Sequence, residues 1–102
     1  MTSVSRTPLR ELVEKRREDI KAVVARHQGR SVSLFGSVAR GDEGPQSDID
    51  FLVELNPGVR PFTLLALGAE LEDLLGVRVD IGTVESLRTG IRERVLAEAV
   101  LL

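Results

Sequence analysis

The sequence predicts a small α/β (α+β) domain in which several helices pack on one sheet. Apolar residues at helical spacing alternate along the chain with short β-prone runs, which is the pattern of a layered helix and sheet fold. The chain has 102 residues and is 42% hydrophobic, enough for one modest core. We therefore expect a single domain over residues 1–102, with residues 1–6 as a flexible lead.

The first element is expected to be one long helix. Thr7 and Pro8 suit the N-cap and the first helical position, and Gly29 suits the C-terminal end. An apolar stripe runs along this helix at spacings of four, seven and four residues, formed by Leu9, Val13, Ile20 and Val24. A strand is expected next, over residues 31–35.

The remaining elements follow the same reasoning. We expect a strand over 49–55, a helix over 62–75 ended by Gly76, a strand over 77–81 and a last helix over 87–99. Residues 100–102 form an apolar tail. Apolar side chains near this end belong either to an oligomer contact or to ordinary core: Val95, Leu96, Leu101 and Leu102.

Composition limits the function. The chain has no cysteine and a single histidine, His27, so a bound metal is expected to be a hard cation held by oxygen ligands. No apolar stretch approaches the roughly 20 residues of a membrane-spanning helix, and we expect a soluble cytoplasmic protein. The net charge of −2 disfavours bulk electrostatic binding of nucleic acid. Residues 6–30 nevertheless hold eight Lys and Arg against four acids, which we interpret as a solvated helix face, with a partner or nucleic-acid contact as the alternative.

The carboxylates of Asp48 and Asp50 form the first half of a candidate site. They stand two residues apart where a strand begins, so both are expected on one face of the sheet. Two negative charges at this separation repel each other, and Mg²⁺ relieves the repulsion while keeping positions open for phosphate oxygens. This spacing favours a metal site.

Gly36, Ser37 and Arg40 form the second half. Gly36 directly follows the first predicted strand, where it permits a positive φ or a close backbone approach to a phosphate. Ser37 supplies a hydroxyl and Arg40 a guanidinium for phosphate oxygens. The chain lacks the P-loop motif and its lysine. The pattern therefore places an anion cradle beside a metal site.

Together these residues resemble the signature of the minimal nucleotidyltransferases, a branch of the DNA polymerase beta superfamily. The matching segments are Gly36-Ser37, Arg40-Gly41 and Ser47-Asp48-Ile49-Asp50, with Val79-Asp80-Ile81 on a later strand. The resemblance implies the nucleotidyltransferase fold, a small mixed sheet of three to four strands.

The same resemblance implies an activity. Asp48 and Asp50 would bind two Mg²⁺ ions, Gly36, Ser37 and Arg40 would hold the triphosphate, and Asp80 would be the third metal-binding and catalytic carboxylate. The reaction would be transfer of a nucleoside monophosphate, AMP from ATP, to a hydroxyl. Such proteins are paired with HEPN-domain ribonuclease toxins, which they neutralise as antitoxins by AMPylation.

Other interpretations stay open. Asp80 could instead form a surface salt bridge with Arg78 or Arg60, and the loop acids Asp42 and Glu43 are expected to be solvated. The chain could also be a non-catalytic binding module that neutralises its partner by occlusion. A nucleic-acid-binding domain that uses the basic first helix is a third hypothesis, which the acidic remainder of the chain disfavours.

Overall fold

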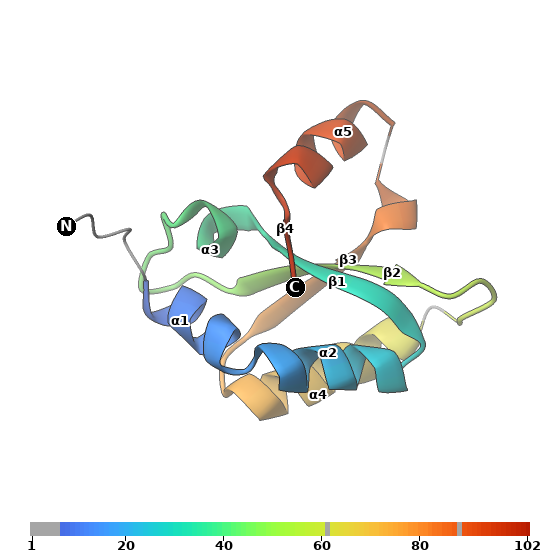
Figure 1. Cartoon of the computed structure of the whole chain (residues 1–102), viewed down its shortest axis with the longest axis horizontal. Helices are drawn as coiled ribbons and strands as arrows, with labels where there is room; N and C mark the ends of the chain where they lie inside the picture. The colour runs from blue at the N-terminus through green and yellow to red at the C-terminus, as the bar shows by residue number, and fades with distance from the viewer. Residues whose placement is uncertain (1–6, 61, 88) are drawn as a thin grey trace.

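A four-stranded mixed sheet forms the centre of the computed structural model, which describes residues 7–60, 62–87 and 89–102 (Figure 1). Its strands are β1 (Gly29–Phe35), β2 (Ile49–Leu55), β3 (Val79–Thr83) and β4 (Val100–Leu101), in the order β3-β2-β1-β4. β1 is antiparallel to both β2 and β4, whereas β2 and β3 are parallel. This arrangement confirms the predicted fold class and strand number. The flexible lead predicted over residues 1–6 lies outside the described residues.

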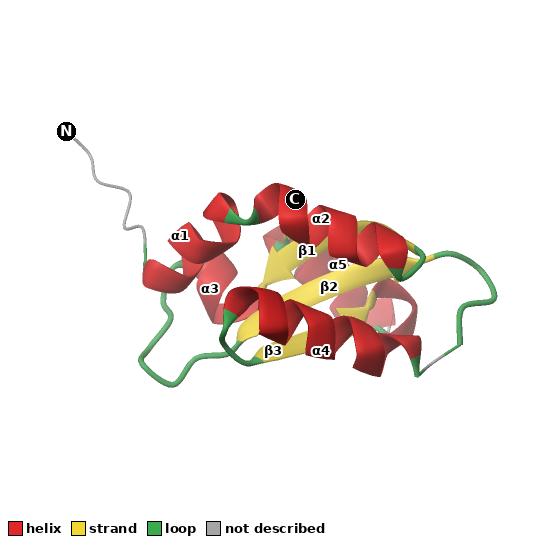
Figure 2. Ribbon diagram, turned by 90° about the horizontal axis from the view of Figure 1, so that it is seen from below, coloured by secondary structure: helices red, strands yellow, loops and turns green. Residues whose placement is uncertain are grey.

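Helices cover the two faces of the sheet unequally. α1 (Pro8–Lys15), α2 (Arg17–Arg26) and α4 (Thr63–Leu75) lie on one side, where α2 and α4 run across the strands (Figure 2). α3 (Gly36–Arg40), the 3₁₀ turn η1 (Val84–Ser86) and α5 (Thr89–Glu98) lie on the other side (Figure 1). The second face therefore has two short elements, α3 and η1, and the helix α5 around it, and it carries the candidate site.

The prediction of one long first helix was wrong. The chain breaks at Arg16, whose φ of −103° and ψ of 16° are not helical, so that α1 contacts α3 while α2 packs on β1. The predicted end at Gly29 was also displaced, because Gln28 takes the positive φ of 66° and Gly29 already belongs to β1. Gly29 is required for another reason: a Cβ there would lie 2.3 Å from Val24 Cγ1.

The core lies between the sheet and the α2/α4 layer. It takes side chains from every major element on that side, and its fully buried members include Val13, Ile20, Leu34, Ile49, Phe51, Val53, Leu67 and Leu71. In β2 the residues Ile49, Phe51 and Val53 alternate with Asp50, Leu52 and Glu54, so the core residues and Asp50 project from opposite faces.

The later elements match the predictions with shifts at their ends. β2 has the predicted bounds, and Gly76 ends α4 in the left-handed conformation with φ of 72°. β3 begins two residues later than predicted. The apolar tail forms β4 and one residue beyond it: Leu101 of β4 is 66% exposed, whereas Leu102, which follows the strand, is buried. Within the described residues no helix is long and apolar enough to cross a membrane.

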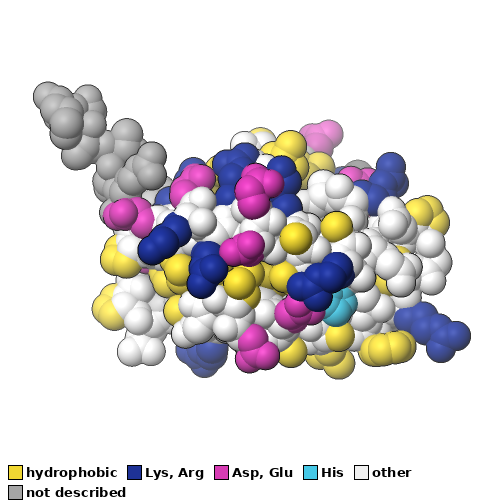
Figure 3. All heavy atoms as spheres, turned by 60° about the horizontal axis from the view of Figure 1, so that its bottom comes forward, with side chains coloured by type: hydrophobic (Ala, Val, Ile, Leu, Met, Phe, Trp, Pro, Cys, Tyr) yellow, Lys and Arg dark blue, Asp and Glu magenta, His cyan; other side chains and the backbone are white. Residues whose placement is uncertain are grey.

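The basic N-terminal segment forms a surface of mixed charge. Figure 3 shows Lys and Arg side chains interspersed with Asp and Glu on the helical side of the molecule. Local ion pairs account for this mixing, among them Arg16 with Asp19 and Arg26 with Glu70. Glu70 also contacts His27, with 2.8 Å between Glu70 Oε1 and His27 Nε2. These contacts fit the solvated-face interpretation of the segment.

Candidate active site

The turn from β1 into α3 brings the two halves of the predicted site together. Gly36 has φ of 75°, a conformation that favours glycine, and a Cβ added there would lie 2.2 Å from Asp50 Oδ2. The register of the sheet explains this proximity, because Phe35 of β1 is paired with Asp50 of β2. The structure therefore gives Gly36 a positive φ, and the group that lies close to its backbone is the Asp50 carboxylate, whereas the approach of a phosphate stays a prediction.

Asp50 lies in a strongly negative environment. Burial raises the pKa of Asp50 above its ordinary value, the negative charges of Asp80 and then Asp48 raise it further, and the positive charge of Arg40 opposes them. Three predicted carboxylates and one predicted cation thus act on each other electrostatically in the fold. Such a group favours a cation as its neighbour.

Asp80 reaches this face by strand pairing. Asp50 and Asp80 are paired in the parallel β2–β3 ladder, and paired residues share a face. Arg78, which the sequence suggested as a possible partner for Asp80, lies instead beside Asp48, with 3.2 Å between Arg78 Nε and Asp48 Oδ1. Asp80 is therefore aligned with Asp50 without that competing ion pair.

Asp48 presents an oxygen that is poorly satisfied. Its Oδ1 atom is buried, and within the described part of the chain it has no partner that meets hydrogen-bond geometry. The nearby Arg78 guanidinium satisfies the distance of an ion pair without the alignment of a hydrogen bond, and its side chain is 75% exposed. An arginine as exposed as this one binds a carboxylate weakly. The Oδ1 atom is consequently available to another cation.

Ser37 faces the loop that leads into β2. Its Oγ atom lies 3.4 Å from Ser47 Oγ, and Ser47 Oγ in turn accepts a hydrogen bond of 2.8 Å from the Gly44 backbone N–H. Arg40, which is exposed, donates from Nε to Asp42 Oδ2 at 3.2 Å. The predicted phosphate-binding residues therefore surround the loop over 41–48.

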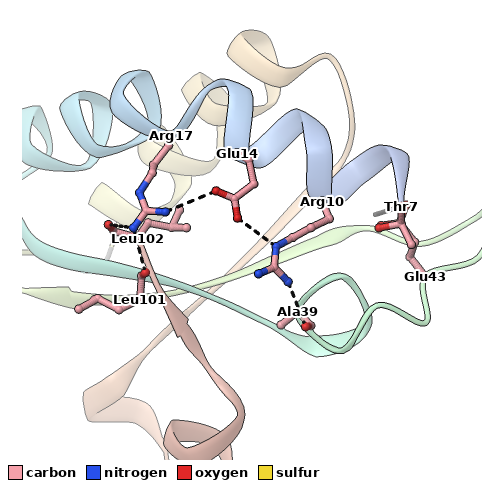
Figure 4. A network of polar contacts seen from close by, with 8 residues as sticks. All are labelled: Thr7, Arg10, Glu14, Arg17, Ala39, Glu43, Leu101 and Leu102. Carbon is pink, nitrogen blue, oxygen red and sulfur yellow. Dashed lines mark hydrogen bonds and ion pairs between the residues drawn. The ribbon is translucent and has the colours of Figure 1, made fainter. Parts of the chain in front are cut away.

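Glu43 is not the solvated acid that the sequence suggested. Its carboxylate accepts hydrogen bonds from the Leu9 backbone N–H, at 3.0 Å, and from the Thr7 hydroxyl, so it caps the start of α1 (Figure 4). No local pattern predicts this contact, because Glu43 lies 34 residues from Leu9 along the chain. Glu43 thereby ties the loop that leads to Asp48 to the helical layer.

Arg10 makes a second tie between α1 and the site. It donates from Nη1 to the Ala39 carbonyl of α3 at 3.2 Å, and from Nε to Glu14 at 3.3 Å (Figure 4). Glu14 also accepts from Arg17, whose Nη2 donates to the Leu102 carbonyl oxygen at 2.7 Å. The network therefore connects α3, which begins at Gly36, to the first two helices and, through Arg17, to the end of the chain.

Comparison with known proteins identifies the family. Residues 11–102 match the nucleotidyltransferase domain, which is most of the chain and includes every residue of the candidate site. The chain belongs to the nucleotidyltransferase domain family.

Individual relatives of this nucleotidyltransferase agree with that assignment. It is 40% identical over 78 residues to a candidate protein adenylyltransferase of Methanocaldococcus jannaschii, covering 76% of this chain and 84% of the relative. It is 34% identical over 91 residues to the protein adenylyltransferase MntA of Thermococcus cleftensis, covering 81% of this chain and 92% of that protein.

Solved structures share the fold of the nucleotidyltransferase. A candidate minimal nucleotidyltransferase superimposes with a TM-score of 0.83 at 43% identity, over 91% of this chain and 95% of that one. The tri-AMPylated Shewanella oneidensis HEPN toxin in complex with its MNT antitoxin gives a TM-score of 0.66 at 19% identity, over 86% of this chain and 69% of that one. The second likeness shows a common fold.

The donor set of the nucleotidyltransferase fits Mg²⁺. The described residues contain no group of three or more His, Cys, Asp or Glu side chains arranged to hold a metal ion. Mg²⁺ commonly binds through only one or two carboxylates and takes its other ligands from water and substrate phosphates. The buried Oδ1 of Asp48 and the crowded carboxylate of Asp50 match that requirement. Asp80 as a third ligand stays a prediction.

Proposed function

We propose that this nucleotidyltransferase is a Mg²⁺-dependent protein adenylyltransferase that transfers AMP from ATP to a hydroxyl of a HEPN-domain toxin and so acts as its antitoxin. The observation that carries the proposal is the close approach of Gly36 to Asp50, which supports a single site formed by the turn and the carboxylates. The names of the relatives support protein as the acceptor, and the AMPylated HEPN toxin complex supports the kind of partner.

In the proposed reaction the residues of the β1–α3 turn bind the triphosphate. The Ser37 hydroxyl donates to a phosphate oxygen, and Arg40 turns from Asp42 to the phosphates. Because a side chain at position 36 would collide with Asp50, the glycine keeps the phosphates close to the carboxylates. The turn thereby orients the α-phosphate for attack.

The carboxylates carry the second part of the reaction. Asp48 and Asp50 would hold two Mg²⁺ ions, which when bound supply positive charge to the phosphates and to the attacking and leaving oxygens. The acceptor oxygen forms a bond to the α-phosphorus, the bond between that phosphorus and the bridging oxygen to the β-phosphate breaks, and pyrophosphate leaves. Asp80, aligned with Asp50, accepts the proton of the acceptor hydroxyl.

The test follows the fate of an α-labelled phosphate. The protein is incubated with α-labelled ATP, Mg²⁺ and a HEPN-domain protein from the same organism, and label on the HEPN protein is quantified. We expect Asp48→Asn and Asp50→Asn each to reduce labelling on the order of a hundred-fold or more, because each removes a metal ligand. Asp73→Asn is the matched control, since it removes an exposed carboxylate of α4 outside the site.

Two results would contradict the proposal. The first is undiminished labelling by either site variant. The second is suppression of the toxin's ribonuclease activity by the variants as fully as by the unmodified protein, which would support occlusion of the toxin instead of catalysis.

A further inference from the structure

β3 forms an open edge of the sheet beside the candidate site. It stands at the end of the strand order, and β2 is its one strand neighbour among the described residues. Ile49 of β2 donates from its backbone N–H to the Arg78 carbonyl at 3.1 Å, which fixes the phase of the parallel ladder. The ladder then directs the backbone groups of Asp80 and Gly82 toward β2, and those of Val79, Ile81 and Thr83 toward the open edge.

Local hydrogen bonds occupy the two ends of this edge and leave the backbone groups at its middle open. The Val79 N–H donates to Glu72 Oε2 at 3.0 Å, and the Thr83 carbonyl accepts from the Ser86 hydroxyl at 2.9 Å. Between them the N–H and C=O of Ile81 point outward. A strand edge with these properties is a template for an additional strand.

The opposite edge of the sheet does not offer the same template. β4 has two residues only, and the chain beyond it continues along β1 because Leu102 donates to the Val32 carbonyl at 3.0 Å. Arg17 then binds the carbonyl oxygens of Leu101 and Leu102 (Figure 4). An added strand is therefore favoured at β3.

An apolar groove runs alongside this edge. It has a volume of about 310 Å³ and lies between α4 and β3. The walls include Leu65, Gly68 and Glu72 from α4, and Val79, Asp80 and Ile81 from β3. Gly68 adds no side chain to the groove, where a Cβ would be in van der Waals contact with Ile81 at 3.9 Å, and Leu65 on the rim is 77% exposed. A leucine with that exposure suits an apolar contact from a partner.

The groove is continuous with the carboxylates through Asp80, which lines it and is also paired with Asp50. Side chains of an added strand alternate between the two faces of the sheet. One set would enter the groove on the α4 side, and the other would project over the face that carries Asp80 and Asp50. The edge thus suits a segment in which apolar and hydroxyl residues alternate.

We propose that an extended segment of the acceptor protein pairs with β3 at Ile81, inserts an apolar side chain into the α4/β3 groove and directs the neighbouring hydroxyl to Asp80. This inference rests on the proposed protein adenylyltransferase activity and adds to it how the acceptor is recognised. The hydroxyl so placed loses its proton to Asp80 as its oxygen bonds to the α-phosphorus of ATP, with pyrophosphate as the leaving group. Acceptor selection then depends on backbone hydrogen bonds and on one apolar contact.

Binding is tested without ATP or Mg²⁺, so that the result is independent of turnover. The probe is a nine-residue peptide of alternating Val and Thr with flanking lysines. Amide hydrogen exchange of the isotope-labelled protein is then measured with and without this peptide. We expect saturating peptide to slow exchange of the Ile81 N–H at least ten-fold. Two N-methylated peptides distinguish strand addition from other modes of binding, one methylated at the odd-numbered residues and one at the even-numbered residues. Only one of these two sets of N–H groups faces β3 in an added strand, so one peptide loses binding and the other retains it. Equal binding of both forms, or no protection of Ile81, overturns the proposal.

Leu65→Asp tests the groove with the HEPN-domain protein as acceptor. This substitution is at an exposed position, so folding is preserved, and we expect KM for the acceptor to rise at least ten-fold with unchanged affinity for ATP. Leu101→Asp is the matched control, because Leu101 is also exposed but lies at the opposite edge of the sheet, and it leaves KM unchanged. Transfer with an unchanged KM in Leu65→Asp overturns the docking proposal alone. Peptide binding without any transfer would overturn the proposed activity and leave the docking intact.

Discussion

Substitution of Gly36 by alanine tests whether the close approach of the turn to Asp50 builds the site. The left-handed conformation at φ of 75° costs a non-glycine residue about 1–2 kcal/mol. The new Cβ also meets Asp50, at 2.2 Å from Oδ2 and 3.2 Å from Cβ, and relief of such overpacking costs about 1–3 kcal/mol more. Because Oδ2 is the end of a flexible side chain, the carboxylate is expected to move, and catalysis should suffer more than stability.

Gly76→Ala provides the matched control. Gly76 has a similar φ of 72° at the end of α4, and an added Cβ there has no atom within 4 Å. Its substitution therefore incurs the backbone cost alone. Urea denaturation should show Gly36→Ala to be less stable than Gly76→Ala by about 1–3 kcal/mol, and thermal denaturation should show a lower Tm by about 4–8 °C for each kcal/mol. Transfer activity should be lost in Gly36→Ala only.

A double-mutant cycle makes the test specific. In an Asp50→Ala background the displaced carboxylate is absent, so the cost of Gly36→Ala should fall toward that of Gly76→Ala. Equal destabilisation by the two glycine substitutions in the unmodified protein, together with retained transfer activity in Gly36→Ala, would refute the reasoning. The contact of Gly36 with Asp50 would then be incidental to the chemistry.

Three further outcomes are expected. Glu43→Ala should lower the free energy of unfolding by about 0.5–2 kcal/mol, because it removes the cap of α1. Glu43→Gln retains a hydrogen-bond acceptor and should lower the free energy of unfolding less. Equal losses of unfolding free energy in the two variants would contradict the capping role. The His27 and Arg26 contacts hold the pKa of Glu70 below its ordinary value of 4.5, so its stabilising contribution is present above about pH 4.5 and is lost as pH falls through the lower folded pKa. The Tm difference between the unmodified protein and Glu70→Gln should accordingly shrink on acidification, and a difference independent of pH would argue against the contact. Arg78→Ala should change stability by less than about 1 kcal/mol, since the ion pair with Asp48 is exposed. It should also lower the Mg²⁺ concentration for half-maximal activity, because it removes a cation beside Asp48. A higher Mg²⁺ concentration for half-maximal activity would count against competition between Arg78 and Mg²⁺ for Asp48.

Local patterns were sufficient to predict the positions of the three residues proposed to bind the triphosphate. Gly36, Ser37 and Arg40 fall on one short turn, and alternation along β2 determines which side Asp50 occupies. The prediction for Asp80 needed strand pairing, which alternation alone does not specify, but the β-prone runs were distinct enough to suggest it. The β2–β3 register confirms that pairing, while the catalytic role of Asp80 stays a prediction.

Contacts between segments distant in sequence were not predictable. Glu43 and Leu9 carry no pattern that connects them, and the break at Arg16 depends on α1 and α2 packing against different neighbours. The sequence left open an ion pair of Asp80 with Arg78. The structure places Arg78 beside Asp48 instead, a contact that arises only after β2 and β3 are paired. Sequence periodicity describes single elements, whereas these contacts arise from their assembly.

Because β2 and β3 are paired in parallel, the register between these two strands determines which side chains form the site. A shift of β3 by one residue would replace Asp80 beside Asp50 with Val79 or Ile81 and turn the carboxylate toward α4. Val79 and Ile81 pack against the core, and this apolar anchoring opposes such a shift. The packing of these apolar side chains therefore selects which functional group lies beside Asp50, and variation in the core of this small domain can alter chemistry while the fold persists.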